Sequence, residues 1–203
     1  MTADAFVIAG VAVLPLAWYC FVMGMTPGPN NLMLAASGMN FGIRRTLPHI
    51  LGVILGFSVL FLLVGLGIGA LYAEVPALQQ VLRWVGSAFL VYLAWRIAGA
   101  GAIETPEDAT PLRFHEAALF QFANPKAWVF STTASASFLG DGGRMGALVL
   151  CVASMFVSVL STTTWTLFGA ALARLISTPR VQRGVNLGFA IALLATVPLI
   201  LLP

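Results

Sequence analysis

Two prolines, a glycine and two asparagines interrupt one of the most apolar parts of the chain, in the stretch "MTPGPNNLML" that begins at Met25. A proline removes one backbone donor from a helix, and a neighbouring glycine lets the chain leave helical angles. Backbone groups freed in an apolar setting need protein, a ligand or cavity water as partners. Asn30 and Asn31 add amides that both donate and accept. We expect this stretch to bind a polar ligand or to bridge its own freed backbone.

A second interruption follows about a hundred residues later, in "ANPKAW". Lys126, the only lysine of the chain, comes directly after Pro125. A basic residue inside a bilayer costs roughly 2.5–3.5 kcal/mol on insertion scales, so something should compensate it. A proline favours a fresh helical start, whose unpaired amides and positive dipole end attract an anion. We expect Lys126 and Asn124 to bind a carboxylate here; the alternative is that Lys126 reaches to the nearer membrane surface and only anchors its helix.

The composition is that of a multi-pass membrane protein. Of the 203 residues, 60% are hydrophobic and 8% are charged, against roughly 25% charged in soluble domains. No charge occurs between Asp4 and Arg44, a run longer than the roughly 20 residues of one span. Further spans are expected at 46–73, 76–98, 116–139, 145–173 and 184–203. The prediction is an all-α, single-domain protein over 1–203 with six transmembrane helices, of which the first and fourth are broken.

The two halves of the chain run in parallel as sequences. Pro27 matches Pro125, and the turn "FGIRR" recurs as "DGGRM". Repeat one covers about 1–98, repeat two about 115–203, and the loop between them 99–114. Because three is an odd number of spans, the second half would cross the membrane in the opposite orientation to the first. Paired helix breaks at corresponding positions of such inverted halves indicate a transporter's binding site. The expected substrate-binding residues are Pro27, Gly28, Pro29, Asn30, Asn31, Asn124, Pro125 and Lys126.

The arginines predict an orientation rather than a nucleic-acid surface, because they are scattered at helix ends. The first, third and fifth loops carry most of them, namely Arg44, Arg45, Arg96, Arg113, Arg174, Arg180 and Arg183. Basic loops face the cytoplasm, so both termini are expected outside.

Other polar residues give further candidates. No expected span has a carboxylate near its centre that could carry a proton. His49, at the start of the second span, is therefore the candidate for proton coupling, and a purely hydrogen-bonding role is the alternative. Ser154, Ser158 and Ser161 share one helix face and are candidates to line a path. The two histidines have no ligand cluster around them, so no metal and no cofactor are expected.

Three stretches carry a family resemblance: "TPGPNN", "SGMNFGIRRTLPHILGVILGF" and "ALFQFANPKAW". They resemble the LysE/RhtB family of amino-acid exporters over nearly the whole chain, and the doubled asparagine and "RRTLPHILG" look most like its branch that exports cysteine and O-acetylserine. The resemblance implies a bacterial inner-membrane protein that exports amino acids by alternating access, driven by an ion gradient, with no catalytic residues.

Two other function classes stay open from the residues. A membrane thiol oxidoreductase would use Cys20 and Cys151, and a membrane assembly protein would tolerate changes at Asn30 and Lys126. The sequence fixes neither the substrate nor the coupling ion, and a symmetric homodimer is only a default. The expected partners are a small amino acid and the lipid bilayer.

Overall fold

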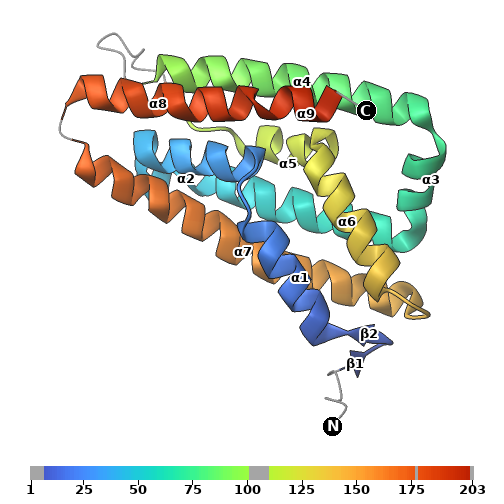
Figure 1. Cartoon of the computed structure of the whole chain (residues 1–203). Helices are drawn as coiled ribbons and strands as arrows, with labels where there is room; N and C mark the ends of the chain where they lie inside the picture. Colours follow the sequence, from blue (N-terminus) through green and yellow to red (C-terminus); the bar gives the residue numbers. More distant parts are fainter. Residues whose placement is uncertain (1–6, 101–109, 177, 202–203) are drawn as a thin grey trace.

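The computed structural model describes residues 7–100, 110–176 and 178–201, which are helical apart from one small β-hairpin (Figure 1). The hairpin pairs β1 (Val7–Ile8) with β2 (Val11–Ala12), an exception to the all-α prediction. The helices are α1 (Val13–Met25), α2 (Pro29–Leu63), α3 (Gly69–Glu74), α4 (Pro76–Gly99), α5 (Phe114–Ala123), α6 (Pro125–Phe138), α7 (Gly143–Leu175), α8 (Pro179–Leu194) and α9 (Thr196–Leu201). A π-helical segment, η1 (Val64–Ile68), joins α2 to α3. The chain start, most of the expected loop 99–114 and the last two residues lie outside the described residues.

Several helical stretches are long and apolar enough to cross a membrane, which confirms a multi-pass membrane protein. In the described residues these are Pro29–Glu74, Pro76–Gly99, Gly143–Leu175 and Pro179–Leu201. The first, with 46 residues, exceeds the roughly 20 that one span needs. It divides at Gly42, where φ is 73° and ψ 171°, and the chain folds back so that Ser37 Oγ lies 2.9 Å from Thr46 Oγ1.

The two expected breaks are present. α1 ends at Met25 and α2 begins at Pro29, whereas α5 ends at Ala123 and α6 begins at Pro125. Pro29 and Pro125 each occupy the first turn of the new helix, where a proline loses no intrahelical bond. The match of Pro27 with Pro125 is therefore wrong in detail, because Pro27 lies in the extended link and Pro29 is the structural counterpart.

The broken helices run in opposite directions. Near the start of α1, the Ala9 carbonyl lies against Gly142, which follows the end of α6. At the other end of α1, the Thr26 carbonyl contacts the side chain of Lys126 at the start of α6. The end of one helix thus meets the beginning of the other, and both breaks lie at the same level of the molecule (Figure 1).

Glycines let α2 approach its neighbours at backbone distance. A Cβ added at Gly38 would collide with the Thr166 carbonyl of α7, and one at Gly169 with the Ala35 carbonyl of α2. Gly52 and Gly56, which have GxxxG spacing, lie against Phe114 and Ala118 of α5. These contacts agree with the packing role of small residues in membrane helices.

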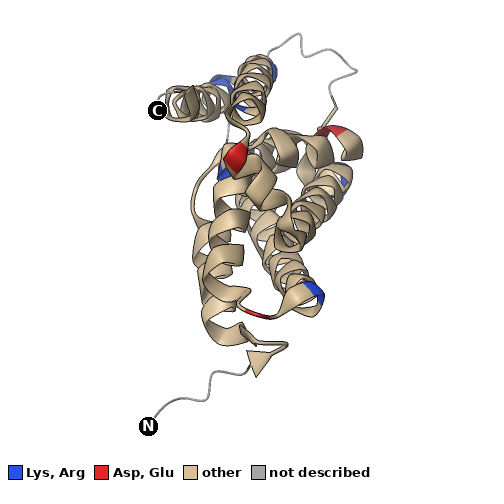
Figure 2. Ribbon diagram, turned by 90° about the vertical axis from the view of Figure 1, so that its right-hand side faces the viewer, with Lys and Arg blue, Asp and Glu red and all other residues tan. Residues whose placement is uncertain are grey.

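Polar side chains join three helices at one end of the molecule. Asn40 Nδ2 donates to Asn186 Oδ1 at 2.7 Å, and Asn186 Nδ2 donates to Asn40 Oδ1 at 3.0 Å. Asn186 Nδ2 also donates to the Ala100 carbonyl at 2.7 Å, and Gln182 Nε2 donates to Asn40 Oδ1 at 3.2 Å. Charged residues occupy only a few short stretches of the ribbon in Figure 2. Neutral amides therefore connect α2 and α8 with the end of α4.

The contact between α2 and α7 predicts that Gly38→Ala destabilises the protein. The added methyl has only backbone to displace, and such overpacking costs about 1–3 kcal/mol. The unfolding temperature in detergent should fall, whereas Gly188→Ala in α8, where a Cβ meets nothing within 4 Å, should not lower it. Equal unfolding temperatures for the two variants would contradict the close approach.

Candidate functional site

Asn31 satisfies the backbone that the first break exposes. Its Nδ2 donates to the Gly24 carbonyl at 2.9 Å and to the Thr26 carbonyl at 2.8 Å. Ser161 of α7 donates to the same Gly24 carbonyl at 2.7 Å. Of the two roles expected for this asparagine, the structure shows the bridge to freed backbone, and α7 supports the end of α1.

The second break is capped differently. Asn124 lies before α6, and its Oδ1 accepts a hydrogen bond from the Lys126 amide at 3.1 Å. The expectation that the amides after Pro125 are open is therefore corrected, because an N-cap asparagine takes one of them. In the first break Gly28 precedes α2, and it has no side chain that could cap this helix. The uncapped helix start lies in the first half of the chain.

The Lys126 side chain crosses from the second break to the first. Its Nζ donates to the Thr26 carbonyl at 2.9 Å, to Thr26 Oγ1 at 2.9 Å and to the Pro27 carbonyl at 3.4 Å. These oxygens are the partners of the Lys126 ammonium group, which turns toward the first break. The stretch that we expected to bind a polar ligand or to bridge its own backbone thus has its Thr26 and Pro27 carbonyls bound by the lysine.

A reciprocal pair of amides joins the two broken helices beside this contact. Asn30 Nδ2 donates to Gln121 Oε1 at 2.7 Å, and Gln121 Nε2 donates to Asn30 Oδ1 at 3.2 Å. Gln121 is fully buried and also donates to the Ala117 carbonyl of its own helix. Sequence reasoning did not assign it a role, although a glutamine in the apolar run three residues before Asn124 was a usable signal.

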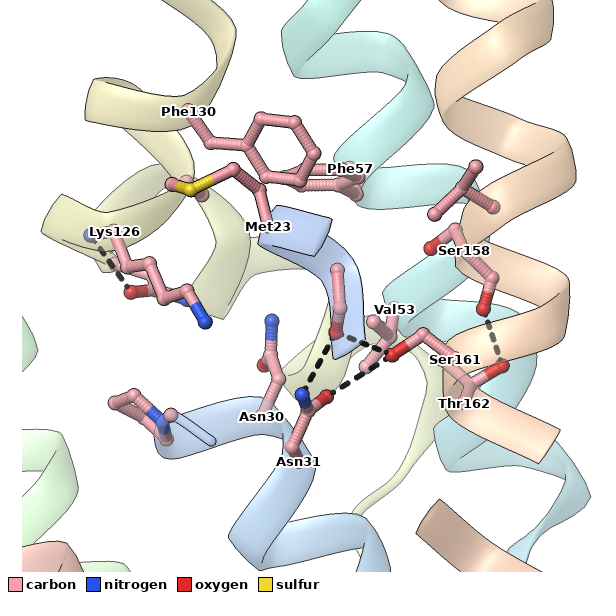
Figure 3. Close-up of a pocket in the computed structure, with 16 residues that line it drawn as sticks. Met23, Asn30, Asn31, Val53, Phe57, Lys126, Phe130, Ser158, Ser161 and Thr162 are labelled. Atoms are coloured by element: carbon pink, nitrogen blue, oxygen red, sulfur yellow. Dashed lines mark hydrogen bonds between the residues drawn. The ribbon is translucent and has the colours of Figure 1, made fainter. Parts of the chain in front are cut away.

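These residues surround a small cavity of about 50 Å³ (Figure 3). A buried water needs roughly 10–15 Å³ of such space, so the cavity holds a few waters and not an amino acid. Of the candidate residues it is lined by Gly28, Pro29, Asn30, Asn31, Asn124, Lys126, Ser158 and Ser161. Pro27, Pro125 and Ser154 do not line it, and Ser154 instead donates to the Cys151 carbonyl within α7.

A second cavity of about 650 Å³ lies between α2, α4 and the start of α5. It extends from Met33, one turn beyond Asn30, to the end of the molecule where the amides of Asn40 and Asn186 meet. His49 lines it with only 1% of its surface exposed, and neither ring nitrogen has a hydrogen-bond partner within the described residues. Arg96, Arg113 and Glu116 line the same cavity.

The family model for LysE type translocators matches residues 21–199 of this chain, which contain both breaks and both cavities. The chain belongs to this family. It is 31% identical over 179 residues to the "Cysteine/O-acetylserine efflux protein" of Escherichia coli (strain K12), an alignment that covers 87% of this chain and 89% of that protein. The protein of the same name from Shigella sonnei (strain Ss046) gives the same values. No solved structure matches the chain at a significant level.

Membership of the LysE translocator family favours transport over thiol chemistry. In the structure Cys20 is a buried free thiol, and Cys151 is a free thiol whose Sγ donates to the Ser58 carbonyl at 3.4 Å. Packing and hydrogen bonding in the apolar interior account for both residues.

The amide pair predicts an energetic coupling between the two breaks of this translocator. Gln121→Leu leaves the partly buried Asn30 amide without its partner, and Asn30→Leu does the same to the fully buried Gln121 amide. An unpaired buried polar group costs about 1–3 kcal/mol. The double variant Asn30→Leu/Gln121→Leu should therefore lose less stability than the two single variants together, with a coupling of about 0.5–3 kcal/mol. Thermal unfolding of the four proteins in detergent measures this cycle, and strictly additive losses would show that the pair is not coupled.

Proposed function

We propose that this LysE type translocator exports small zwitterionic amino acids, or close derivatives, across the bacterial inner membrane. One observation carries the proposal: two broken helices from different halves of the chain meet at their breaks and surround one cavity with amides, freed carbonyls and a single ammonium group. The printed names of its relatives, cysteine/O-acetylserine efflux proteins, support the substrate class. The chemistry is binding and release, and no catalytic residue is proposed.

The proposed site offers a partner for each charge of such a substrate. The carboxylate would meet Lys126 and the start of α2, which is uncapped and carries the positive end of a helix dipole. The ammonium would meet carbonyls freed near Pro27 and the side chains of Asn30 and Asn31, with Asn124 beside them. Half-helix amino ends facing carboxylates and unwound carbonyls facing cations form the pattern of transporters with broken helices.

We further propose that the halves are two inverted repeats of three spans each, which alternate access to the cavity. The opposite directions of α1 and α6 support this, as do glycines with positive φ in the matching turns, Gly42 at 73° and Gly143 at 52°. The 650 Å³ cavity would be the cytoplasmic approach, because Arg96 and Arg113 line it and basic loops face the cytoplasm. Both termini would then lie outside, and a symmetric homodimer is the default assembly.

Path-lining and coupling roles follow from the same arrangement. Ser158 and Ser161 of α7 line the small cavity, and their hydroxyls are proposed to hydrogen-bond water there during transport. Ser154 would instead stabilise α7 through its hydrogen bond to the Cys151 carbonyl. His49 is proposed to carry the coupling proton, since it lines the proposed cytoplasmic cavity and has no hydrogen-bond partner among the described residues. Within the described part of the chain, the charged or titratable groups that line the cavity with it are Arg96 and Tyr92 of α4, Arg113, and Glu116 of α5.

Transport into inverted membrane vesicles tests the function. Labelled L-cysteine, O-acetylserine and a panel of other amino acids should enter vesicles that contain the protein, and a proton gradient should increase the uptake. The variant Cys20→Ala/Cys151→Ala should keep full uptake, which a thiol oxidoreductase would not predict. If no amino acid enters above the level of vesicles without the protein, the proposed function is wrong.

The role of His49 predicts a change in the pH profile. His49→Gln keeps a hydrogen-bonding side chain but cannot take up a proton, so uptake driven by the gradient should fall. Its dependence on pH should flatten between about pH 5 and 8, where histidine ordinarily titrates. Exchange of substrate without a gradient should continue and serves as the internal control. Unchanged gradient-driven uptake with an unchanged pH profile would leave His49 only a structural role.

A further inference from the structure

The Lys126 ammonium group is fully satisfied by the first break. A lysine ammonium has three N–H donors and no acceptor. Three oxygens surround it: the Thr26 carbonyl and Thr26 Oγ1 at 2.9 Å each, and the Pro27 carbonyl at 3.4 Å. Thr26 Oγ1 is held in place because it donates to the Met23 carbonyl at 2.8 Å. The first break is therefore a formed binding site for a primary ammonium group, with three acceptors.

The α-ammonium of an amino acid is the same chemical group, with the same three donors and the same charge. The oxygens of Thr26 and Pro27 that could accept from it already accept from Lys126. The remaining cavity of about 50 Å³ is too small for an amino acid. A substrate can therefore bind here only if the lysine side chain moves and gives up both the oxygens and the space.

We propose that Lys126 is a built-in competitor for the substrate's ammonium group, which makes the site selective for ligands that carry a carboxylate as well. In the empty protein the lysine holds the carbonyls of the first break. A zwitterion displaces it because the ligand's ammonium replaces the lysine on these oxygens while its carboxylate pairs with the displaced lysine. An amine without a carboxylate leaves the displaced lysine without a counter-ion, so it fails to bind. This inference rests on the proposed export function and adds the basis of its selectivity.

Gly28 leaves the space that the Lys126 side chain occupies. A Cβ at Gly28 would lie 3.0 Å from both Lys126 Cδ and Lys126 Nζ, closer than ordinary van der Waals contact. The backbone at Gly28 is extended, with φ −176° and ψ 178°, which any residue adopts. Gly28→Ala would therefore push the end of a flexible side chain away from its oxygens and leave the backbone and the charge of Lys126 intact.

Two variants and three ligands test the proposal. L-cysteine carries both charges, cysteamine lacks the carboxylate and 3-mercaptopropionate lacks the ammonium. Uptake of labelled L-cysteine into inverted vesicles is measured with the other two as inhibitors. The shift of the unfolding temperature of purified protein by each ligand gives a second readout that does not depend on transport.

For the unaltered protein we expect neither single-charge ligand to inhibit at about a tenfold excess over L-cysteine, a margin that corresponds to about 1.4 kcal/mol. In Lys126→Met the competitor is gone, so cysteamine should inhibit and raise the unfolding temperature. The affinity for L-cysteine should fall about tenfold or more, because the ligand's carboxylate loses its charge-assisted hydrogen bond to the lysine. Gly28→Ala should also become sensitive to cysteamine while losing less affinity for L-cysteine than Lys126→Met does, and Gly188→Ala should behave as the unaltered protein.

The outcomes separate this inference from the proposed function. If L-cysteine is transported but Lys126→Met gains no sensitivity to cysteamine in either readout, Lys126 is no competitor and the inference fails while export stands. Inhibition of the unaltered protein by cysteamine as strong as that of Lys126→Met would also overturn it. If no amino acid is transported and none shifts the unfolding temperature, the proposed function fails first and the inference fails with it.

Discussion

Backbone carbonyls that leave a helix within an apolar layer must find donors, and the arrangement around the first break follows from this constraint. Between Gly24 and Pro27 these donors come from three places in the chain: Asn31 just after the break, Ser161 of α7, and Lys126 of the other half. Because the carbonyls of the first break accept hydrogen bonds from distant residues, the ends of α1, α2 and α6 are fixed relative to one another. The same requirement is the basis for proposing that the region binds a ligand with equivalent donors.

Close helix packing allows these donors to reach the carbonyls of the first break. Gly38 and Gly169 let the backbones of α2 and α7 touch, and Gly28 leaves space for the lysine beside the break. Larger side chains at these places would separate the helices or displace the ammonium group. In membranes small residues take this role because apolar burial alone does not draw helices together against lipid.

The two cavities differ in size and in the groups that line them. The small cavity is lined by apolar side chains such as Phe57 and Phe130 and by polar groups that already bind one another. The large cavity is lined by His49, whose ring nitrogens have no hydrogen-bond partner among the described residues. Phe120, next to Gln121 in the chain, and Met33, one turn after Asn30, belong to the same apolar cluster. In the proposed transport cycle, opening toward the larger cavity would have to rearrange this cluster and the amide pair together.

The sequence by itself determined the membrane class, the helical architecture, both breaks and the residues beside them, because these depend on local chemistry: apolar length, the missing donor of proline and the freedom of glycine. It also carried the resemblance that the LysE family match confirms. Only the tertiary structure decided which partner each freed group takes. Asn124 caps α6, Gln121 pairs with Asn30, and Lys126 binds the carbonyls of Thr26 and Pro27, about a hundred residues away in the chain. Such pairings depend on how two antiparallel helices meet in space, and no local pattern of residues encodes that distance.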